Sequence, residues 1–437
     1  MTTFIKRFYH PGFKLVKKLC LPKCPMGEKS IYFSHVWGNM VQELQLKEKT
    51  SQHFYDTDKI NYYSNEISKF YNNNVMFIPT SHNTPITTAL KSLRKIDADK
   101  FIKKLDPSIT NNDGVFINNS ENRSKLYHLI NYCSNNQEID IIESAIYGIY
   151  SNFGDSIYIA NDYLSVDDDK VILANYPDKA SSREVERCRV VAYCLLNGNY
   201  PIVLDEHIDF EGEANIKYIP AIIQKNGKKE QLCFGYSSSR SCTKSIKNIN
   251  KYIGRMGLPH LKEICLYPRE GLEKYFYHFD CISNFYTEGD TQYFDSEESF
   301  WRNYKKNGTT VVEMNGVKNE EDTRRILETI FENIIEVRKE DDLLCANMIM
   351  QEDGIVGSSK LSNIEELEKV NKGFFFPHPS TGGGGAHKCC SNVLMRNRPL
   401  TITDWRHFLK EYDMENNVDE LFIEGVDEEM DRIIKIK

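Results

Sequence analysis

The sequence predicts an α/β fold with strands inside and helices outside. Two observations predict it. From about residue 146, short runs rich in β-branched and aromatic residues alternate with amphipathic stretches. The unit that recurs is two strands, a helix and a strand, as a repetition of pattern and not of sequence. Such alternation is typical of helices packed around a layer of strands.

The individual elements follow from local pattern. Apolar and β-branched runs predict strands at 156–160, 170–174, 200–204, 216–224, 231–236, 263–267, 275–285, 309–314, 373–376 and 392–395, and a hairpin at 347–357. Apolar residues at helical spacing predict helices at 86–105, 184–196, 243–256, 320–337 and 364–370. The acidic tail, with Glu424, Asp427, Glu428, Glu429 and Asp431, is expected to form a solvated helix.

The composition and residue pattern of the chain change at about residue 145. Residues 1–145 carry polar connections rich in Asn and Lys, such as 71–74 and 111–114, and no motif that we can match. We assign this region no role and leave open whether it forms part of the same fold. Residues 146–437 hold all the motifs described below.

Bulk properties exclude several functional classes. The chain has 437 residues, with 55 basic and 63 acidic side chains and a net charge of -8. This balance argues against a general partner of nucleic acid or of anionic membranes, and it is compatible with a small cationic substrate. No apolar run approaches the ~20 residues needed to cross a bilayer. The 12 cysteines show no paired framework, which predicts free thiols in a reducing, cytoplasmic environment.

The first chemical motif is a glycine run followed by two thiols. Cys389 and Cys390 come shortly after the glycines at 382–385. Backbone N–H groups crowd around a thiol in such a loop, which lowers its pKa and leaves room for a ligand. The alternative is a flexible turn with two structural thiols. The residues alone do not decide which sulfur faces a ligand.

The second motif is His278-Phe279-Asp280 in an apolar stretch that predicts a strand. Residues i and i+2 of a strand point to the same face, so His278 and Asp280 are expected to share one wall. A lone buried His is more often a hydrogen-bonded core residue. The neighbouring acid favours a functional role, because a buried carboxylate needs a cationic partner.

Three further acids complete the set. Asp162 follows a predicted strand, and Glu211 and Glu213 flank Gly212. Each of these acids alone is an ordinary turn residue. A thiol, a histidine, a carboxylate to orient it and two more carboxylates are, however, the groups needed to attack a cationic guanidinium carbon.

The ordered set resembles the guanidino-group modifying enzymes, the superfamily of arginine and agmatine deiminases, dimethylarginine hydrolases and arginine amidinotransferases. The resemblance runs from about 155 to 395, a little over half of the chain. It implies that Asp162 and Asp280 bind the substrate guanidinium. It also implies that Arg183, near the start of a predicted helix, binds a substrate carboxylate.

The resemblance implies three catalytic residues as well. Cys389 would be the nucleophile, because the family pattern Cys-x-Ser/Thr is met by Cys389 with Ser391 and selects it over Cys390. His278 would transfer protons, and Glu211, in the place of the Glu of a Glu-Gly-Gly motif, would orient His278. The implied fold is a compact five-bladed α/β propeller of strand-strand-helix-strand blades around a central channel.

Three departures from the family pattern are visible. Arginine deiminases carry an Arg inside the glycine stretch, and the stretch at 382–385 has none. Three residues, Ala386, His387 and Lys388, separate the last glycine from Cys389, where the family has two. Glu213 stands where the motif has its second glycine.

The implied function is a thiol-dependent hydrolase that acts on a guanidinium through a covalent Cys389 intermediate, giving a citrulline-type product and an amine or ammonia. The partner is a small guanidino substrate; a homodimer is left open, and no metal or organic cofactor is expected. The alternatives are an arginine amidinotransferase that passes the amidino group to an amine, and a guanidinium-binding pseudoenzyme. A cysteine protease has the residue types but would leave Asp162 and Asp280 without a role.

Overall fold

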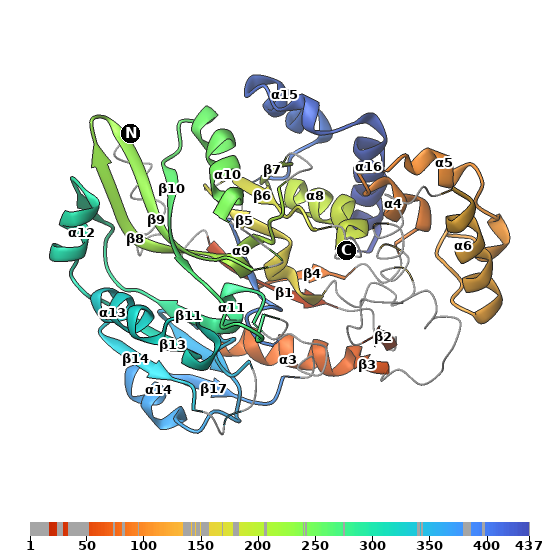
Figure 1. The fold of residues 1–437 in the computed structure, drawn as a ribbon. Coiled ribbons are helices and arrows are strands. Elements are labelled where there is room, and N and C mark those ends of the chain that lie inside the picture. Colours follow the sequence, from red (N-terminus) through yellow and green to blue (C-terminus); the bar gives the residue numbers. More distant parts are fainter. Residues whose placement is uncertain are drawn as a thin grey trace.

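The computed structural model shows a mixed α/β protein (Figure 1). The residues that it describes are 17–23, 29–33, 52–72, 75–80, 84–94, 96–133, 141, 145, 149, 157–167, 169–177, 183–204, 208–238, 240, 243–273, 276–338, 341, 344–378, 386–395 and 398–436. The glycines at 382–385 lie outside them. Within the described part of the chain, no helix combines the length and the apolar character needed to span a bilayer.

Five sheets in the described residues share one pattern, in which a central strand pairs antiparallel with one neighbour and parallel with the other. In each, a helix connects the two parallel strands. The first unit holds β5 (Tyr163–Ser165), β6 (Lys170–Leu173), α8 (Arg187–Leu196) and β7 (Tyr200–Ile202). The second holds β8 (Ile216–Lys225), β9 (Lys228–Tyr236), α10 (Thr243–Arg255) and β10 (His260–Leu266).

The third and fourth units repeat this order. The third holds β11 (Ser283–Tyr286), β13 (Thr309–Val312), α13 (Glu320–Ile330) and β14 (Asn333–Glu336). Between β11 and β13 lie β12 (Gln292–Phe294), which pairs with β8, and α12 (Glu297–Asn303). The fourth holds β15 (Ile349–Gln351), β16 (Gly354–Gly357), α14 (Ile364–Val370) and β17 (Gly373–Phe375).

The fifth unit joins the two ends of the chain. Its strands are β18 (Asn392–Met395), β1 (Lys17–Lys23) and β4 (Val75–Pro79), and its helix is α3 (Thr57–Phe70). β18 pairs antiparallel with β1, which pairs parallel with β4. Strands from the first 80 residues therefore complete a sheet that begins near residue 392.

The remaining elements lie outside these units. They are the hairpin β2 (Lys29–Phe33) and β3 (Gln52–Asp56), the helices α4 (Ile86–Lys91), α5 (Ala98–Ile102), α6 (Ser120–Cys133), α15 (Ile402–Glu411) and α16 (Glu420–Ile436), the one-turn helices α9 (Gly212–Asn215) and α11 (Phe279–Ile282), and the 3₁₀ turns η2 (Pro107–Ile109), η4 (Ile159–Asn161), η6 (Met314–Gly316) and η8 (Glu415–Asn417).

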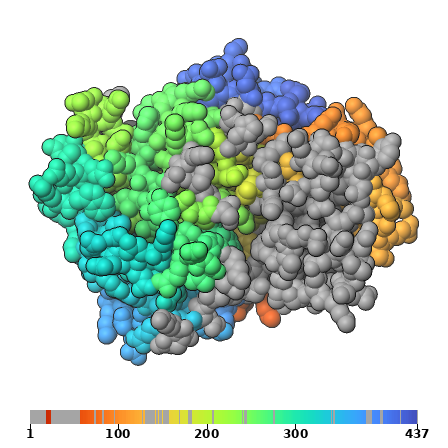
Figure 2. Space-filling model, viewed as in Figure 1, coloured from red at the N-terminus to blue at the C-terminus, as the bar shows by residue number. Residues whose placement is uncertain are grey.

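The buried apolar clusters connect each unit to the next. One cluster joins units 5, 1 and 2 with α15 and α16, a second joins units 2 and 3, a third joins units 3 and 4, and a fourth joins units 4 and 5. In Figure 1, α11, β1 and β5 lie near the middle of the view, whereas α12, α13 and α14 lie at its edge. Figure 2 shows the same succession on the surface, from green at the upper left through teal and cyan to blue at the lower left.

Most of the predicted elements are confirmed, and the recurring unit of two strands, a helix and a strand is among them. The hairpin at 347–357 is present as β15 and β16, and α14 and β18 have the predicted bounds. Helix α13 begins at an N-cap, Asn319, whose side chain accepts from the N–H of Asp322. The tail is helical, but it is not fully solvated, because α16 packs on α8 and buries Phe422 and Val426.

Four predictions of local structure are wrong. The predicted strand at 275–285 is the helical turn α11 followed by β11, and the described part of the strand at 156–160 leads into the 3₁₀ turn η4. The helix at 86–105 is two short helices, α4 and α5. The helix at 320–337 ends at Ile330, and residues 333–336 pair with β13 as β14. Tertiary pairing decides here, because segments buried on several sides carry no clear period.

Candidate active site

Each of the five units places one polar residue just ahead of its first strand. These residues are Asp162 before β5, Glu211 before α9 and β8, His278 before α11 and β11, Asn347 before β15, and Cys389 before β18. All five are buried, with at most 5% of their surface exposed. The predicted residues Asp162, Glu211, His278 and Cys389 thus lie ahead of the first strand of units 1, 2, 3 and 5.

His278 and Glu211 form a direct pair. The Nε2 of His278 lies 2.9 Å from Oε2 of Glu211, which also accepts from the side-chain amide of Asn161 at 2.9 Å. Burial alone would raise the pKa of Glu211, but the positive charges of Arg240 and His278 outweigh burial and bring the pKa well below its usual range. An ionised carboxylate only accepts, so the hydrogen bond to Glu211 places a proton on Nε2 of His278.

The glycine after Glu211 is required by its surroundings. Gly212 has a φ of +56°, and a Cβ there would lie 2.7 Å from the carbonyl oxygen of Ala160 and 2.8 Å from that of Tyr163. Only glycine lets the second unit approach the backbone of the first so closely. The Glu211-Gly212 motif therefore has a local physical reason.

Arg240 is a site residue that our sequence reasoning missed. Its Nε and Nη2 donate to the two oxygens of Glu211, the Nη2–Oε2 distance being 2.9 Å, and its guanidinium lies 5.5 Å from the ring centre of Tyr277. Burial would lower its pKa, but the charge of Glu211 raises it overall. It lies in a serine-rich stretch between β9 and α10, where no local signal marks it.

Cys389 lies against Asp280. Its Sγ is 3.5 Å from Oδ2 of Asp280, and the Sγ of Cys281 is 3.6 Å from the other oxygen. Burial raises the pKa of Asp280 above its ordinary value, although His278, Lys388 and the Cys389 thiol act in the opposite direction. This geometry favours Cys389 over Cys390 as the sulfur that faces the carboxylates.

Asn347, also missed from the sequence, touches the same sulfur. Its Nδ2 lies 3.1 Å from Sγ of Cys389. An asparagine at the start of a predicted hairpin carries no signal of this contact, which joins segments 42 residues apart.

Asp162 binds guanidinium groups of the protein itself. Nη2 of Arg183 lies 2.5 Å from its Oδ1, and Nη2 of Arg189 lies 3.6 Å from its Oδ2. The hydroxyl of Tyr176 is 3.1 Å from Oδ1, and the Arg183 guanidinium lies 5.6 Å from the centre of that ring. The resemblance implied that Arg183 binds a substrate carboxylate and that Asp162 binds the substrate guanidinium. In the structure, Arg183 and Asp162 bind each other.

Two of the departures from the family pattern, at Lys388 and Glu213, contact each other. Nζ of Lys388, the last residue before Cys389, lies 3.1 Å from Oε2 of Glu213 and 3.1 Å from the carbonyl oxygen of Ser391. The hydroxyl of Ser391 in turn donates to the carbonyl oxygen of Lys388. This ion pair ties the turn that carries Cys389 to the segment that carries Glu211.

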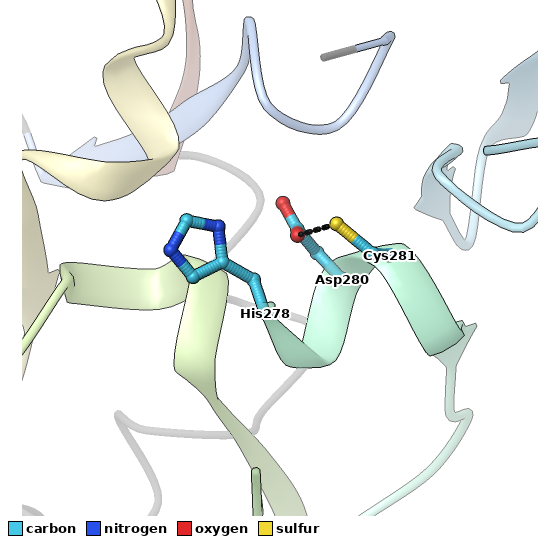
Figure 3. A group of neighbouring side chains, drawn as sticks. All are labelled: His278, Asp280 and Cys281. Carbon is cyan, nitrogen blue, oxygen red and sulfur yellow. Dashed lines mark hydrogen bonds between the residues drawn. The ribbon is translucent and has the colours of Figure 1, made fainter. Parts of the chain in front are cut away.

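Three donor groups in the site are close enough to hold a metal ion. The donor atoms of His278, Asp280 and Cys281 lie within 4.8 Å of one another. Figure 3 shows the His278 and Asp280 side chains on the same side of the turn that begins α11, with Cys281 hydrogen-bonded to Asp280. The hydrogen bond to Cys389, burial and Asp280 hold the pKa of Cys281 well above its ordinary value. The Nε2 of His278 and the Oδ2 of Asp280 already contact Glu211 and Cys389, and we assign no metal to this group.

Comparison with known proteins gave matches among solved structures alone. No protein-family model and no curated protein matches the chain. The N-terminal domain of ArgZ, an arginine dihydrolase from cyanobacteria, solved as a mutant bound to substrate, is 20% identical over 55% of this chain and 76% of that chain, with a TM-score of 0.40. Unliganded AgrE is 12% identical over 88% of this chain and 40% of that chain, with a TM-score of 0.47.

A third similar structure is a mutant of DDAH from Pseudomonas aeruginosa in complex with citrulline. It is 13% identical over 56% of this chain and 77% of that chain, with a TM-score of 0.36. These structures are of guanidino-modifying enzymes of the amidinotransferase superfamily, the group that the sequence motifs resemble.

Proposed function

We propose that this protein is a thiol-dependent hydrolase of a guanidinium substrate, with Cys389 as nucleophile, His278 as general acid and base, and Glu211 as the group that orients His278. One observation carries the proposal. The sulfur of Cys389 lies 3.5 Å from the carboxylate of Asp280, two residues from a histidine whose Nε2 is 2.9 Å from Glu211. Segments far apart in the chain thus bring a thiol, an acid and an oriented histidine together.

Two carboxylates are available to bind the cation. A planar guanidinium donates paired hydrogen bonds to a carboxylate, and Asp280 lies beside the nucleophile. Asp162 already binds a guanidinium, that of Arg183. For the substrate to use Asp162, Arg183 must move away, which frees its guanidinium to bind a substrate carboxylate.

The chemical steps follow from these positions. The Cys389 thiolate attacks the guanidinium carbon and forms a C–S bond in a tetrahedral adduct. His278 gives a proton to the departing nitrogen, the C–N bond breaks, and an amine or ammonia leaves. His278 then takes a proton from water, the water oxygen adds to the carbon, and the C–S bond breaks. The products are a urea-type compound and the free thiolate.

We also propose that the five units are the blades of an α/β propeller with the site at its centre. The shared strand order and the apolar clusters between successive units, including between the fifth and the first, support this arrangement. The equivalent placement of a polar residue ahead of each first strand is what converging blades would produce.

The test is mass spectrometry of the wild-type protein and Cys389→Ala after incubation with arginine, agmatine and methylated arginines, with and without glycine. We expect a urea-type product without glycine, absent in Cys389→Ala and retained in the control Cys390→Ala. Product formed only with glycine would make the protein an amidinotransferase. Ligand binding without turnover, and no adduct on Cys389, would refute the enzyme and leave a guanidinium-binding protein.

A further inference from the structure

We propose that Asn347 is a further catalytic residue of this site, whose side-chain amide stabilises the Cys389 thiolate by a hydrogen bond. The inference rests on the proposed role of Cys389 and adds a group from the fourth unit to it. Asn347 lies two residues before β15, and its side chain is fully buried at 0% exposure. Its Nδ2 is 3.1 Å from the Cys389 sulfur, within hydrogen-bond distance for a sulfur acceptor.

The surroundings of the amide fix its orientation. Oδ1 of Asn347 accepts from the backbone N–H of Lys388 at 2.9 Å and from that of Cys389 at 3.1 Å. Nδ2 donates to the carbonyl oxygen of Asp280 at 3.1 Å as well as to the sulfur. An asparagine amide has two donor hydrogens and an oxygen with two lone pairs, so its whole capacity is used. A flipped amide would turn its donors toward two N–H groups and its oxygen toward a carbonyl oxygen.

A donor aimed at the sulfur changes the acid–base balance of the thiol. A hydrogen bond to the charged form of a group favours that form, and a thiolate is a better acceptor than a thiol. The amide of Asn347, 3.1 Å from the sulfur, is therefore placed to stabilise the charge of a Cys389 thiolate.

The same four bonds also set the distance between nucleophile and carboxylate. Asn347 links the backbone of Cys389 to the backbone of Asp280, residues that lie 109 positions apart in the chain. Catalysis depends on such positioning as well as on charge. If Asn347 only held Cys389 in place, its removal would leave the titration midpoint of the thiol unchanged. The midpoint therefore distinguishes a structural role from stabilisation of the thiolate.

The chain offers a matched control in Asn284. Its buried amide donates to the same carbonyl oxygen of Asp280 at 2.7 Å and to that of Ala346 at 2.8 Å. Asn284→Ala therefore removes an amide from the same neighbourhood without removing the donor that contacts the sulfur.

The experiment measures the pH dependence of Cys389 alkylation by iodoacetamide in the wild type, Asn347→Ala and Asn284→Ala, with the adduct located by fragment mass spectrometry. Thiolate absorbance, taken as the difference from Cys389→Ala, gives the same midpoint without a reagent. We expect the midpoint to rise by about one to two pH units in Asn347→Ala and by less than about 0.3 in Asn284→Ala. Equal midpoints in the wild type and Asn347→Ala, or equal shifts in both variants, would overturn the inference.

A second pair keeps the test usable if Asn347→Ala does not fold. Asn347→Asp preserves the shape and an acceptor oxygen, and Asn284→Asp places the same charge on the other amide. The inference requires a larger rise of the midpoint in Asn347→Asp, and equal rises would overturn it. If turnover requires Cys389 but the titration midpoint of Cys389 is the same in the wild type and the Asn347 variants, this inference fails and the proposed function stands. If Cys389→Ala keeps full turnover, the proposed function fails, and the titration still reports whether Asn347 binds the sulfur.

Discussion

Replacing Gly212 by alanine tests whether the second unit is held against the first by a contact that only glycine allows. Gly212 has a φ of +56°, and an added Cβ would lie 2.7 to 2.9 Å from backbone atoms of Ala160, Tyr163 and Asn161. Backbone atoms cannot swing aside as the end of a side chain can. The contact must therefore open, and the two units must separate locally.

Two energetic costs set the size of the stability loss expected in Gly212→Ala. A non-glycine residue in the left-handed region costs about 1–2 kcal/mol. Overpacking a tight contact adds about 1–3 kcal/mol. We therefore expect Gly212→Ala to lower the free energy of unfolding by about 2–5 kcal/mol.

Gly227→Ala is the control for the cost of the left-handed backbone conformation alone. Gly227 has a φ of +77° in the turn between β8 and β9, and a Cβ there would meet nothing within 4 Å. Its loss should be about 1–2 kcal/mol. Both variants gain the same rigidity in the unfolded chain, so the difference between them isolates the contact.

The assay is urea unfolding of the wild type and both variants, compared at equal slope. Turnover of the guanidino substrate is measured in parallel, because Glu211 precedes Gly212 and its displacement should lower kcat by about 10²-fold. Equal stability losses in Gly212→Ala and Gly227→Ala would refute the close contact, and unchanged turnover would refute its role in placing Glu211.

Three further outcomes are expected. Glu211→Gln should lower kcat by up to ~10⁴-fold. The pKa of Glu211 in the folded protein lies below its ordinary 4.5, so the variant should be less stable than the wild type by the full amount above pH 4.5 and by less as the pH falls below it, which urea titrations across pH will show. Asp280→Asn should lower kcat by about 10²–10³-fold. Because burial raises the pKa of Asp280, the variant should be more stable than the wild type at neutral pH, and this gain should vanish below pH 3.8, the ordinary pKa of the group; a loss of stability at neutral pH would contradict this. In a double-mutant cycle, Lys388→Met and Glu213→Gln should couple by about 0.5–1 kcal/mol, a modest value because the Glu213 side chain is 23% exposed, and additive effects would refute the pairing.

The sequence by itself determined the chemical groups and much of the local structure. The order Asp162, Glu211, His278 and Cys389 is written in the chain, and so are elements with a clear local signal. Helix α14 and strand β18 fall where the pattern places them. Local signals suffice there, because hydrogen bonds within a few residues and one apolar face define such elements.

Only the tertiary structure decided which groups meet. Arg240 on Glu211 and Asn347 on Cys389 join segments 29 and 42 residues apart, and no local pattern marks either partner. The pairing of β1 with β18 likewise gives the first part of the chain a place that its own composition does not show. The turn at His278 was predicted as a strand, because a segment buried on every side has no polar face to set its period. Contacts of this kind depend on the path of the whole chain, which local periodicity does not record.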